Sequence, residues 1–104
     1  MNQSNGNTQP KFNLGALVAT PGALNALEES GETPLLFLKR HVTGDWGDLC
    51  AEDRKANDNA IAHEGDLEKQ MRVFSTYKTK NEVKIWIITE YDRSVTTILL
   101  PSEY

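Results

Sequence analysis

Apolar residues follow two different periodicities along the chain, and the change from one to the other predicts the fold class. Up to residue 63 they recur in short stripes at helical spacing. From residue 71 onward they form short runs rich in β-branched and aromatic residues, separated by polar links. Two or three helices followed by strands predict an α+β domain, with the helices packed on a three-stranded antiparallel β-meander.

Capping residues indicate where the helices begin. Thr20-Pro21 and Thr33-Pro34 each combine a capping hydroxyl with a proline suited to the first helical turn, so a helix is expected after each pair. A third helix is expected over residues 49–63, with Asp48 as its cap. The apolar residues upstream, within 12–18, are expected to form an extended or helical lead-in.

Three strands are expected, over residues 71–78, 83–90 and 96–100. The middle one contains the continuous apolar run Ile85-Trp86-Ile87-Ile88, which is typical of burial on both faces. We therefore expect it to be the central strand. The links between the three segments are short and polar, which favours antiparallel hairpin connections.

The length of 104 residues corresponds to one domain with one core. Residues 1–10 are rich in Asn, Gln, Ser and Gly and show no apolar periodicity, so they are expected to be a disordered tail. Residues 11–104 are then the single α+β domain.

Charge and cysteine content exclude several classes of protein. The net charge of −4 argues against a basic nucleic-acid-binding face, and no apolar run is long enough to span a membrane. The start of the chain lacks the apolar segment of a secretory signal. The single cysteine, Cys50, permits no internal disulfide and is expected to be a small buried residue. These observations predict a cytoplasmic protein, and no cofactor is expected.

The loop Gly44-Asp45-Trp46-Gly47-Asp48 is the most distinctive stretch of the chain. Trp46 has two interpretations: it fastens the loop to the helices or sheet, or it anchors a contact with a partner. Asp45 and Asp48 either form the turn and cap a helix, or recognise a basic partner surface. The acidic residues and His41 lack a complete metal-ligand set, so no metal site is expected.

His41, Glu90 and Arg93 are the residue types that metal-free RNA cleavage requires: a base, an acid and a cation that stabilises the phosphorane. His41 and Arg93 also have simpler interpretations. His41 falls in the last turn of the second helix, where a cation offsets the helix dipole. Arg93 would form a surface pair with Asp92 in a turn, an interaction worth little.

Several segments resemble a family of short proteins encoded on bacterial plasmids and integrative elements and called plasmid-related. They are Arg40-His41, Gly44-Asp45-Trp46-Gly47-Asp48-Leu49, Glu52-Asp53-Arg54, Asn57, Ile85-Trp86-Ile87-Ile88-Thr89-Glu90, Asp92-Arg93-Ser94, Thr96-Thr97-Ile98-Leu99-Leu100-Pro101 and Glu103-Tyr104. The similarity spans about residues 14–104, and its most distinctive motif is Gly-Asp-Trp-Gly-Asp. The resemblance implies a mobile-element setting, in which small accessory proteins block host defences or act as toxins. It carries no activity that can be assigned residue by residue.

The leading functional hypothesis is a non-enzymatic protein-binding accessory protein of a mobile genetic element, such as an inhibitor of host defence of the anti-CRISPR or anti-restriction type. Trp46 would anchor the contact, and Asp45 and Asp48 would recognise a protein partner with a basic surface. The alternative is a small metal-independent ribonuclease of barnase-like type that uses His41, Glu90 and Arg93, and only this alternative has a nucleic-acid partner. Convergence of the last three side chains in a cleft would favour the enzyme.

Overall fold

The computed structural model of the protein describes residues 9–104. Its elements are, in chain order, β1 (Ala16–Ala19), α1 (Pro21–Ser30), α2 (Pro34–Val42), α3 (Ala51–Ala62), β2 (Val73–Lys78), β3 (Lys84–Thr89), β4 (Val95–Leu99) and the short 3-10 helix η2 (Pro101–Glu103). The predicted α+β class is confirmed. The expected tail over residues 1–10 lies, up to residue 8, outside the described residues.

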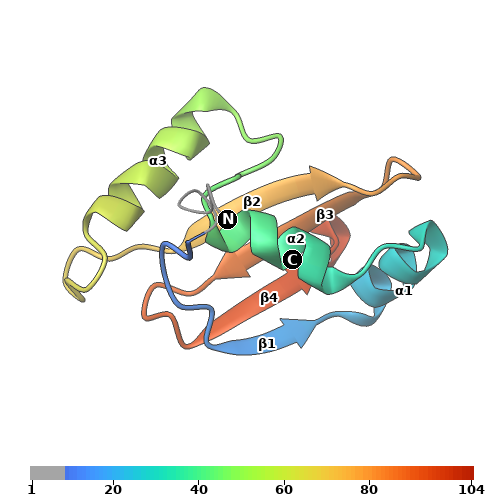
Figure 1. The fold of residues 1–104 in the computed structure, drawn as a ribbon, viewed down its shortest axis with the longest axis horizontal. Coiled ribbons are helices and arrows are strands. Elements are labelled where there is room, and N and C mark those ends of the chain that lie inside the picture. Colours follow the sequence, from blue (N-terminus) through green and yellow to red (C-terminus); the bar gives the residue numbers. More distant parts are fainter. Residues whose placement is uncertain (1–8) are drawn as a thin grey trace, which may run out of the picture.

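The four strands form one mixed sheet in the order β1-β4-β3-β2 (Figure 1). β2, β3 and β4 are antiparallel neighbours, as predicted, with Ile87 opposite both Ser75 and Ile98. The prediction of only three strands is wrong, because β1 pairs in parallel with β4, Ala16 lying opposite Val95. β1 has only four residues, too few to show a periodicity, and its partner comes from the far end of the chain.

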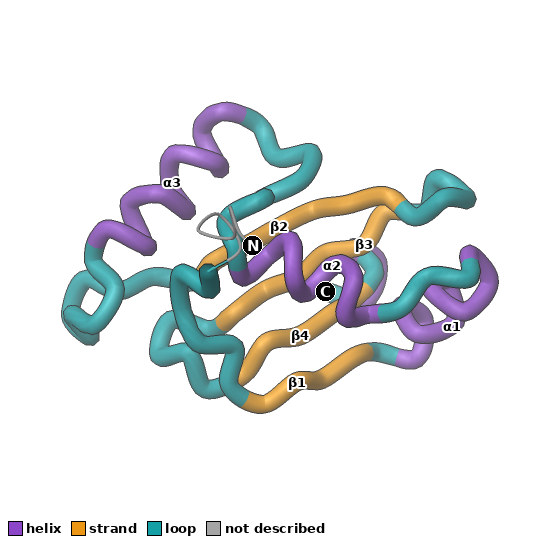
Figure 2. The backbone as a smooth tube through the Cα atoms, viewed as in Figure 1, coloured by secondary structure: helices purple, strands orange, loops and turns teal. Residues whose placement is uncertain are grey.

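α1 and α2 pack against one face of the sheet, α2 crosses directly over it, and α3 lies beside the β2 edge (Figure 2). Alternate strand residues point toward this face, which we call the inner face, and meet α1 and α2 in the main core. The buried residues of this core are Ala23, Ala26, Leu27, Phe37, Leu38, Tyr77, Ile85, Ile87 and Ile98. β3 is an interior strand, and its residues Ile85 and Ile87 are fully buried.

The start of α1 follows from local capping, and the predicted caps of α2 and α3 need correction. Thr33 occupies the cap position of α2, but its hydroxyl makes no capping hydrogen bond. The Thr20 hydroxyl accepts a hydrogen bond from the Ala23 amide at 3.3 Å and so caps α1, as predicted. The prediction that Asp48 caps α3 is wrong, because Cys50 occupies the cap position. The first i→i−4 bond of α3 runs from the Arg54 amide to the Cys50 carbonyl at 3.0 Å, so Asp48 precedes the helix, and its amide donates instead to the Thr76 carbonyl of β2 at 2.8 Å. Cys50 is exposed at this position rather than buried as expected.

The outer edge of β2 is covered by groups from α3 and from the loop before it. The Asn57 side chain imitates a neighbouring strand: its amide donates to the Phe74 carbonyl at 2.6 Å, and its oxygen accepts from the Phe74 amide at 3.1 Å. Two residues further along, the Thr76 amide donates to the Trp46 carbonyl at 3.2 Å. The backbone groups that a sheet edge normally exposes are thus paired within the protein along this part of β2.

Candidate functional site

The structure places the Trp46 ring inside the protein, where it is only 4% exposed. It belongs to a second core cluster with Phe12, Leu49, Ala60 and Val73. Its indole N–H donates to an Asp58 carboxylate oxygen at 3.3 Å, so its one polar group is also satisfied. This geometry corresponds to the interpretation in which Trp46 fastens the loop to the domain, and it leaves the ring away from the surface.

The residues around Trp46 hold the same loop against β2. Gly47 has a φ of +76°, and a side chain there would overlap the Thr76 carbonyl, so only glycine fits. The Tyr77 hydroxyl donates to the Asp45 carbonyl at 2.6 Å. The Asp45 carboxylate is paired with Arg40 at 2.7 Å, and this bond lowers the pKa of Asp45. The motif is therefore explained by local structure, and only its carboxylates, including that of Asp48, face solvent.

His41 is fully buried on the inner face of the sheet. Its Nδ1 lies 2.5 Å from the Ser75 hydroxyl and its Nε2 lies 3.0 Å from the Thr89 hydroxyl. Burial lowers the pKa of His41 to about 3, with a smaller contribution from the positive charge of Arg93. The expectation of a charged histidine that offsets the helix dipole is therefore wrong, because desolvation keeps the ring neutral.

The hydrogen bonds around His41 form a chain with a fixed direction. Thr96 donates its hydroxyl hydrogen to the Leu14 carbonyl at 2.7 Å, so the 2.7 Å contact between Thr96 and Thr89 is donated by Thr89. The Thr89 oxygen then accepts from His41 Nε2, which leaves Nδ1 as the acceptor for the Ser75 hydroxyl. If the His41 ring took up a second proton, Nδ1 could no longer accept the hydroxyl hydrogen of Ser75. The network is thus complete with a neutral ring.

Arg93 is buried and engaged at the end of the hairpin between β3 and β4. Its guanidinium pairs with Glu64 at 2.8 Å and donates to the Met71 carbonyl at 2.7 Å. The expected surface pair with Asp92 is wrong, because the Asp92 carboxylate instead accepts from the Ser94 amide at 3.0 Å. Arg93 therefore ties the turn to the segment that follows α3.

The three residues of the ribonuclease hypothesis do not meet in a cleft. Alternation along β3 points Thr89 toward His41 and the next residue, Glu90, toward the opposite face of the sheet. On that face Glu90 pairs with Arg72 at 3.3 Å. His41 is sealed from solvent and Arg93 is engaged with other groups, so this arrangement offers no common point to a phosphate.

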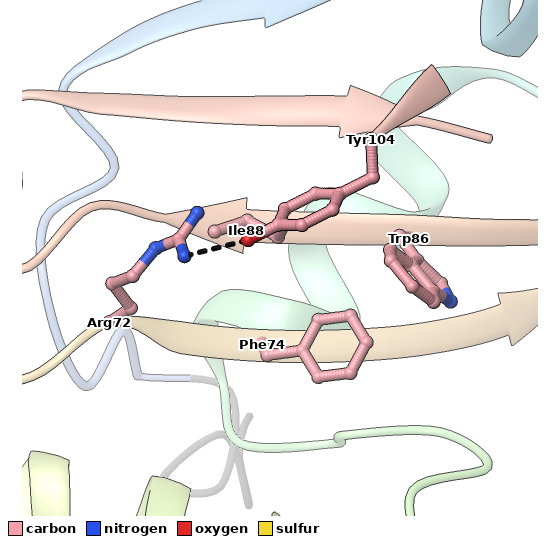
Figure 3. Close-up of a pocket in the computed structure, with 5 residues that line it drawn as sticks. All are labelled: Arg72, Phe74, Trp86, Ile88 and Tyr104. Carbon is pink, nitrogen blue, oxygen red and sulfur yellow. Dashed lines mark hydrogen bonds between the residues drawn. The ribbon is translucent and has the colours of Figure 1, made fainter. Parts of the chain in front are cut away.

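The face of the sheet opposite the helices, which we call the open face, carries a cavity of about 330 Å³. It is lined by Arg72, Phe74, Trp86, Ile88 and Tyr104, and we name it the open-face pocket. Figure 3 shows the three aromatic rings around the hollow, with Arg72 at one end of it. Phe74, Trp86 and Ile88 reach this side because they alternate with the residues of the inner face.

The aromatic walls of the open-face pocket are held by edge-to-face contacts. The centroid of Trp86 lies 5.0 Å from that of Phe74 and 5.7 Å from that of Tyr104. Arg72 donates to the Tyr104 hydroxyl at 3.2 Å and to Glu90 at 3.3 Å, which fixes the polar end of the pocket. The pocket therefore combines apolar walls with one charged, oriented rim.

The position of Tyr104 is set by the residue before it. Glu103 accepts hydrogen bonds from the Gly22 amide at 3.0 Å, from the Leu100 amide at 2.9 Å and from the Thr20 hydroxyl. These bonds lower the pKa of Glu103, the Thr20 hydroxyl making the largest contribution. They fasten η2 to the start of α1, so the ring of Tyr104 stands over the pocket while remaining 70% exposed.

Reasoning from the sequence missed the open-face pocket, although a signal for it was present. The run Ile85-Trp86-Ile87-Ile88 predicted burial on both faces of the strand. α1 and α2 cover the inner face and, among residues 9–104, no α-helix covers the opposite one (Figure 1), so Trp86 remains half-buried there and Ile88 forms the buried floor of the pocket. Apolar residues on an uncovered sheet face indicate a site of contact.

Among the described residues, no group of three histidine, cysteine or acidic side chains is placed to hold a metal ion. Within residues 9–104, no helix has the length and apolar character needed to cross a membrane. Comparisons with models of protein families, with curated proteins and with solved structures each gave no match.

Proposed function

We propose that the protein is a non-enzymatic protein-binding protein and that the open-face pocket is its contact site. The observation that carries this proposal is the aromatic cavity on a sheet face that the helices leave uncovered. Its preferred occupant is an apolar or aromatic side chain of a partner protein. This proposal moves the contact away from Trp46, because its buried ring is not accessible to a partner.

The composition of the pocket supports this proposal. Tryptophan, tyrosine, phenylalanine and arginine are enriched at protein interfaces and among the residues that contribute most to affinity. A cavity of about 330 Å³ has room for a large side chain. Arg72 and Glu90 at the rim provide a donor and an acceptor for the partner's backbone or polar groups.

The setting that we propose is a mobile genetic element, with inhibition of host defence as the biological role. The resemblance to plasmid-related proteins supports the setting. A basic partner surface is supported by the net charge of −4. The ribonuclease alternative finds no support, because His41 is sealed in the core and Glu90 lies on the other face.

Affinity capture from cells of the native host, followed by binding measurements with the purified partner, tests this proposal. Trp86→Ala removes a wall of the pocket and should weaken partner binding at least about 30-fold, the size of a hot-spot contact. Leu67→Ala is the matched control, because Leu67 is an exposed apolar residue that does not line the pocket. Equal affinity of Trp86→Ala and the wild type would refute the proposed site.

A further inference from the structure

The two edges of the sheet differ in how they are protected. The β2 edge is covered by Asn57 and by the loop at Trp46. β1 forms the opposite edge, and in Figure 1 no other described element lies beyond it. Its residues Leu17 and Val18 are 58% and 49% exposed, so this edge presents apolar side chains together with its backbone.

The hydrogen-bond pattern shows which backbone groups of β1 are available. Ala16 donates to the Ser94 carbonyl at 3.0 Å, and Thr20, just beyond the strand, donates to the Ile98 carbonyl at 2.9 Å. In a parallel pair, only alternate residues bond to a given neighbour. The N–H and C=O groups of Leu17 therefore point away from β4, and among residues 9–104 they have no backbone partner outside the sheet.

Apart from its shortness of four residues, β1 has none of the features that normally prevent edge pairing. Natural edge strands are protected by charges, prolines or bulges. β1 reads Ala-Leu-Val-Ala, and no charged residue occurs from Phe12 to Leu27. The protein as a whole carries a net charge of −4, so an uncharged edge is the surface on which two copies can meet with least repulsion.

We propose that β1 pairs antiparallel with β1 of a second copy of this chain. The dimer would form a continuous eight-stranded sheet around a two-fold axis, because the same surface is used by both copies. This proposal concerns an interface separate from the open-face pocket, and its test needs no partner protein.

The hydrogen-bond pattern restricts the register of this dimer. Residues with outward-pointing backbone groups must lie opposite one another. Leu17 therefore faces either Leu17 of the second copy or its Ala19, and the pairing is centred on Leu17 or on Val18. In both registers, each β1 residue on the inner face of one copy pairs with a β1 residue on the inner face of the other copy. The helices of both copies then lie on one side of the sheet, and both open faces lie on the other.

This arrangement has a consequence for binding, which rests on the proposed function. The dimer presents two open-face pockets on the same side of one sheet. A partner with two matching sites would then gain avidity without any new contact. If the protein does not dimerise, this bivalency is lost but the open-face pocket is unaffected. The dimer proposal and the proposed binding site can therefore be refuted independently.

Proline scanning of β1, followed by analytical ultracentrifugation from micromolar to millimolar concentration, tests the dimer. Leu17→Pro removes only the outward-pointing N–H and should leave the pairing with β4 intact. Leu17→Lys places a charge on the same edge and serves as a second variant. Leu67→Lys introduces the same charge at another exposed leucine and is the matched control.

We expect the wild type and Leu67→Lys to sediment as dimers at high concentration. Leu17→Pro and Leu17→Lys should raise the dimer Kd at least about tenfold, since each blocks the pairing edge. Their melting temperatures, measured at low concentration, should stay near that of the wild type. A wild type that remains monomeric at millimolar concentration overturns the proposal, as does a dimer that neither substitution at Leu17 weakens.

Discussion

His41 donates its Nε2 hydrogen to the Thr89 hydroxyl across 3.0 Å, and this bond joins α2 to β3 inside the core. The same ring accepts from Ser75 of β2. One neutral imidazole thus connects a helix with two strands. A buried polar network of this kind specifies a particular packing only while each member keeps its partner. The protonation state of His41 therefore controls stability, which leads to the first prediction.

The free energy of unfolding should fall as the pH drops below about 6.5, the ordinary pKa of histidine. The unfolded chain then takes up a proton at His41, whereas the native ring, with its pKa of about 3, does not. The stabilisation is complete above the unfolded pKa and is lost as the pH falls toward the native pKa. Each pH unit in this window should cost about 1.4 kcal/mol.

Urea unfolding between about pH 7 and about pH 5 measures this slope, above the range in which carboxylates titrate. His41→Gln should reduce the slope even though it also lowers stability. His63→Gln should retain it, because the His63 side chain is exposed and its ring bonds only to the Asn59 carbonyl. A wild-type stability that is constant over this window would contradict the neutral, buried His41.

Trp46→Ala should destabilise the protein by about 3–5 kcal/mol, the usual cost of truncating a buried aromatic residue. The cause is loss of packing in the cluster with Phe12 and His41 and of the bond to Asp58. The affinity of the folded fraction for a partner should not change. Denaturant melts and binding measurements on the same variant check both statements, and a stable variant with weakened binding would return Trp46 to the interface.

Gly47→Ala should destabilise the protein more than Gly31→Ala, by at least about 1 kcal/mol. Both glycines have a φ near +75°, so alanine meets the same backbone strain at each position. Only at Gly47 does the added carbon also overlap the Thr76 carbonyl, whereas nothing lies within 4 Å of it at Gly31. Thermal melts compare the two variants, and equal losses would show that the close approach to β2 is not required.

Ile87→Ala should cost about 2–5 kcal/mol, the range for truncating a fully buried aliphatic side chain. Ile87 is 0% exposed and sits between Ser75 and Ile98 in the centre of the sheet. Denaturant unfolding measures the loss. A loss below about 1 kcal/mol would contradict the place of β3 in the core.

The sequence predicted the elements that are long enough to carry a local signal. Strands β2, β3 and β4 show β-propensity and polar links, and α1 has a hydroxyl cap and a terminal glycine, Gly31. β1 escaped prediction because its four residues gain their structure from pairing with β4 at the other end of the chain. Periodicity in the sequence carries no information about such a distant partner.

The chemistry of single residues was harder to predict than the elements, because it depends on burial. His41 follows a basic pair, which suggested a charged helix end, yet its position on α2 turns the ring into the core. The Gly-Asp-Trp-Gly-Asp loop left both interpretations of Trp46 open, and only the structure shows that Gly47 serves a close backbone contact with β2. The open-face pocket required knowing which face of β3 the helices cover.

The most direct test of the open-face pocket as the contact site is the affinity of a purified partner for two tryptophan variants measured side by side. Trp86→Ala, which removes a pocket wall, should raise Kd at least about 30-fold and leave the fold intact. Trp46→Ala should leave Kd unchanged for the folded fraction while lowering the melting temperature. The opposite division, with affinity lost only in Trp46→Ala, would contradict the account and place the contact in the Gly-Asp-Trp-Gly-Asp loop.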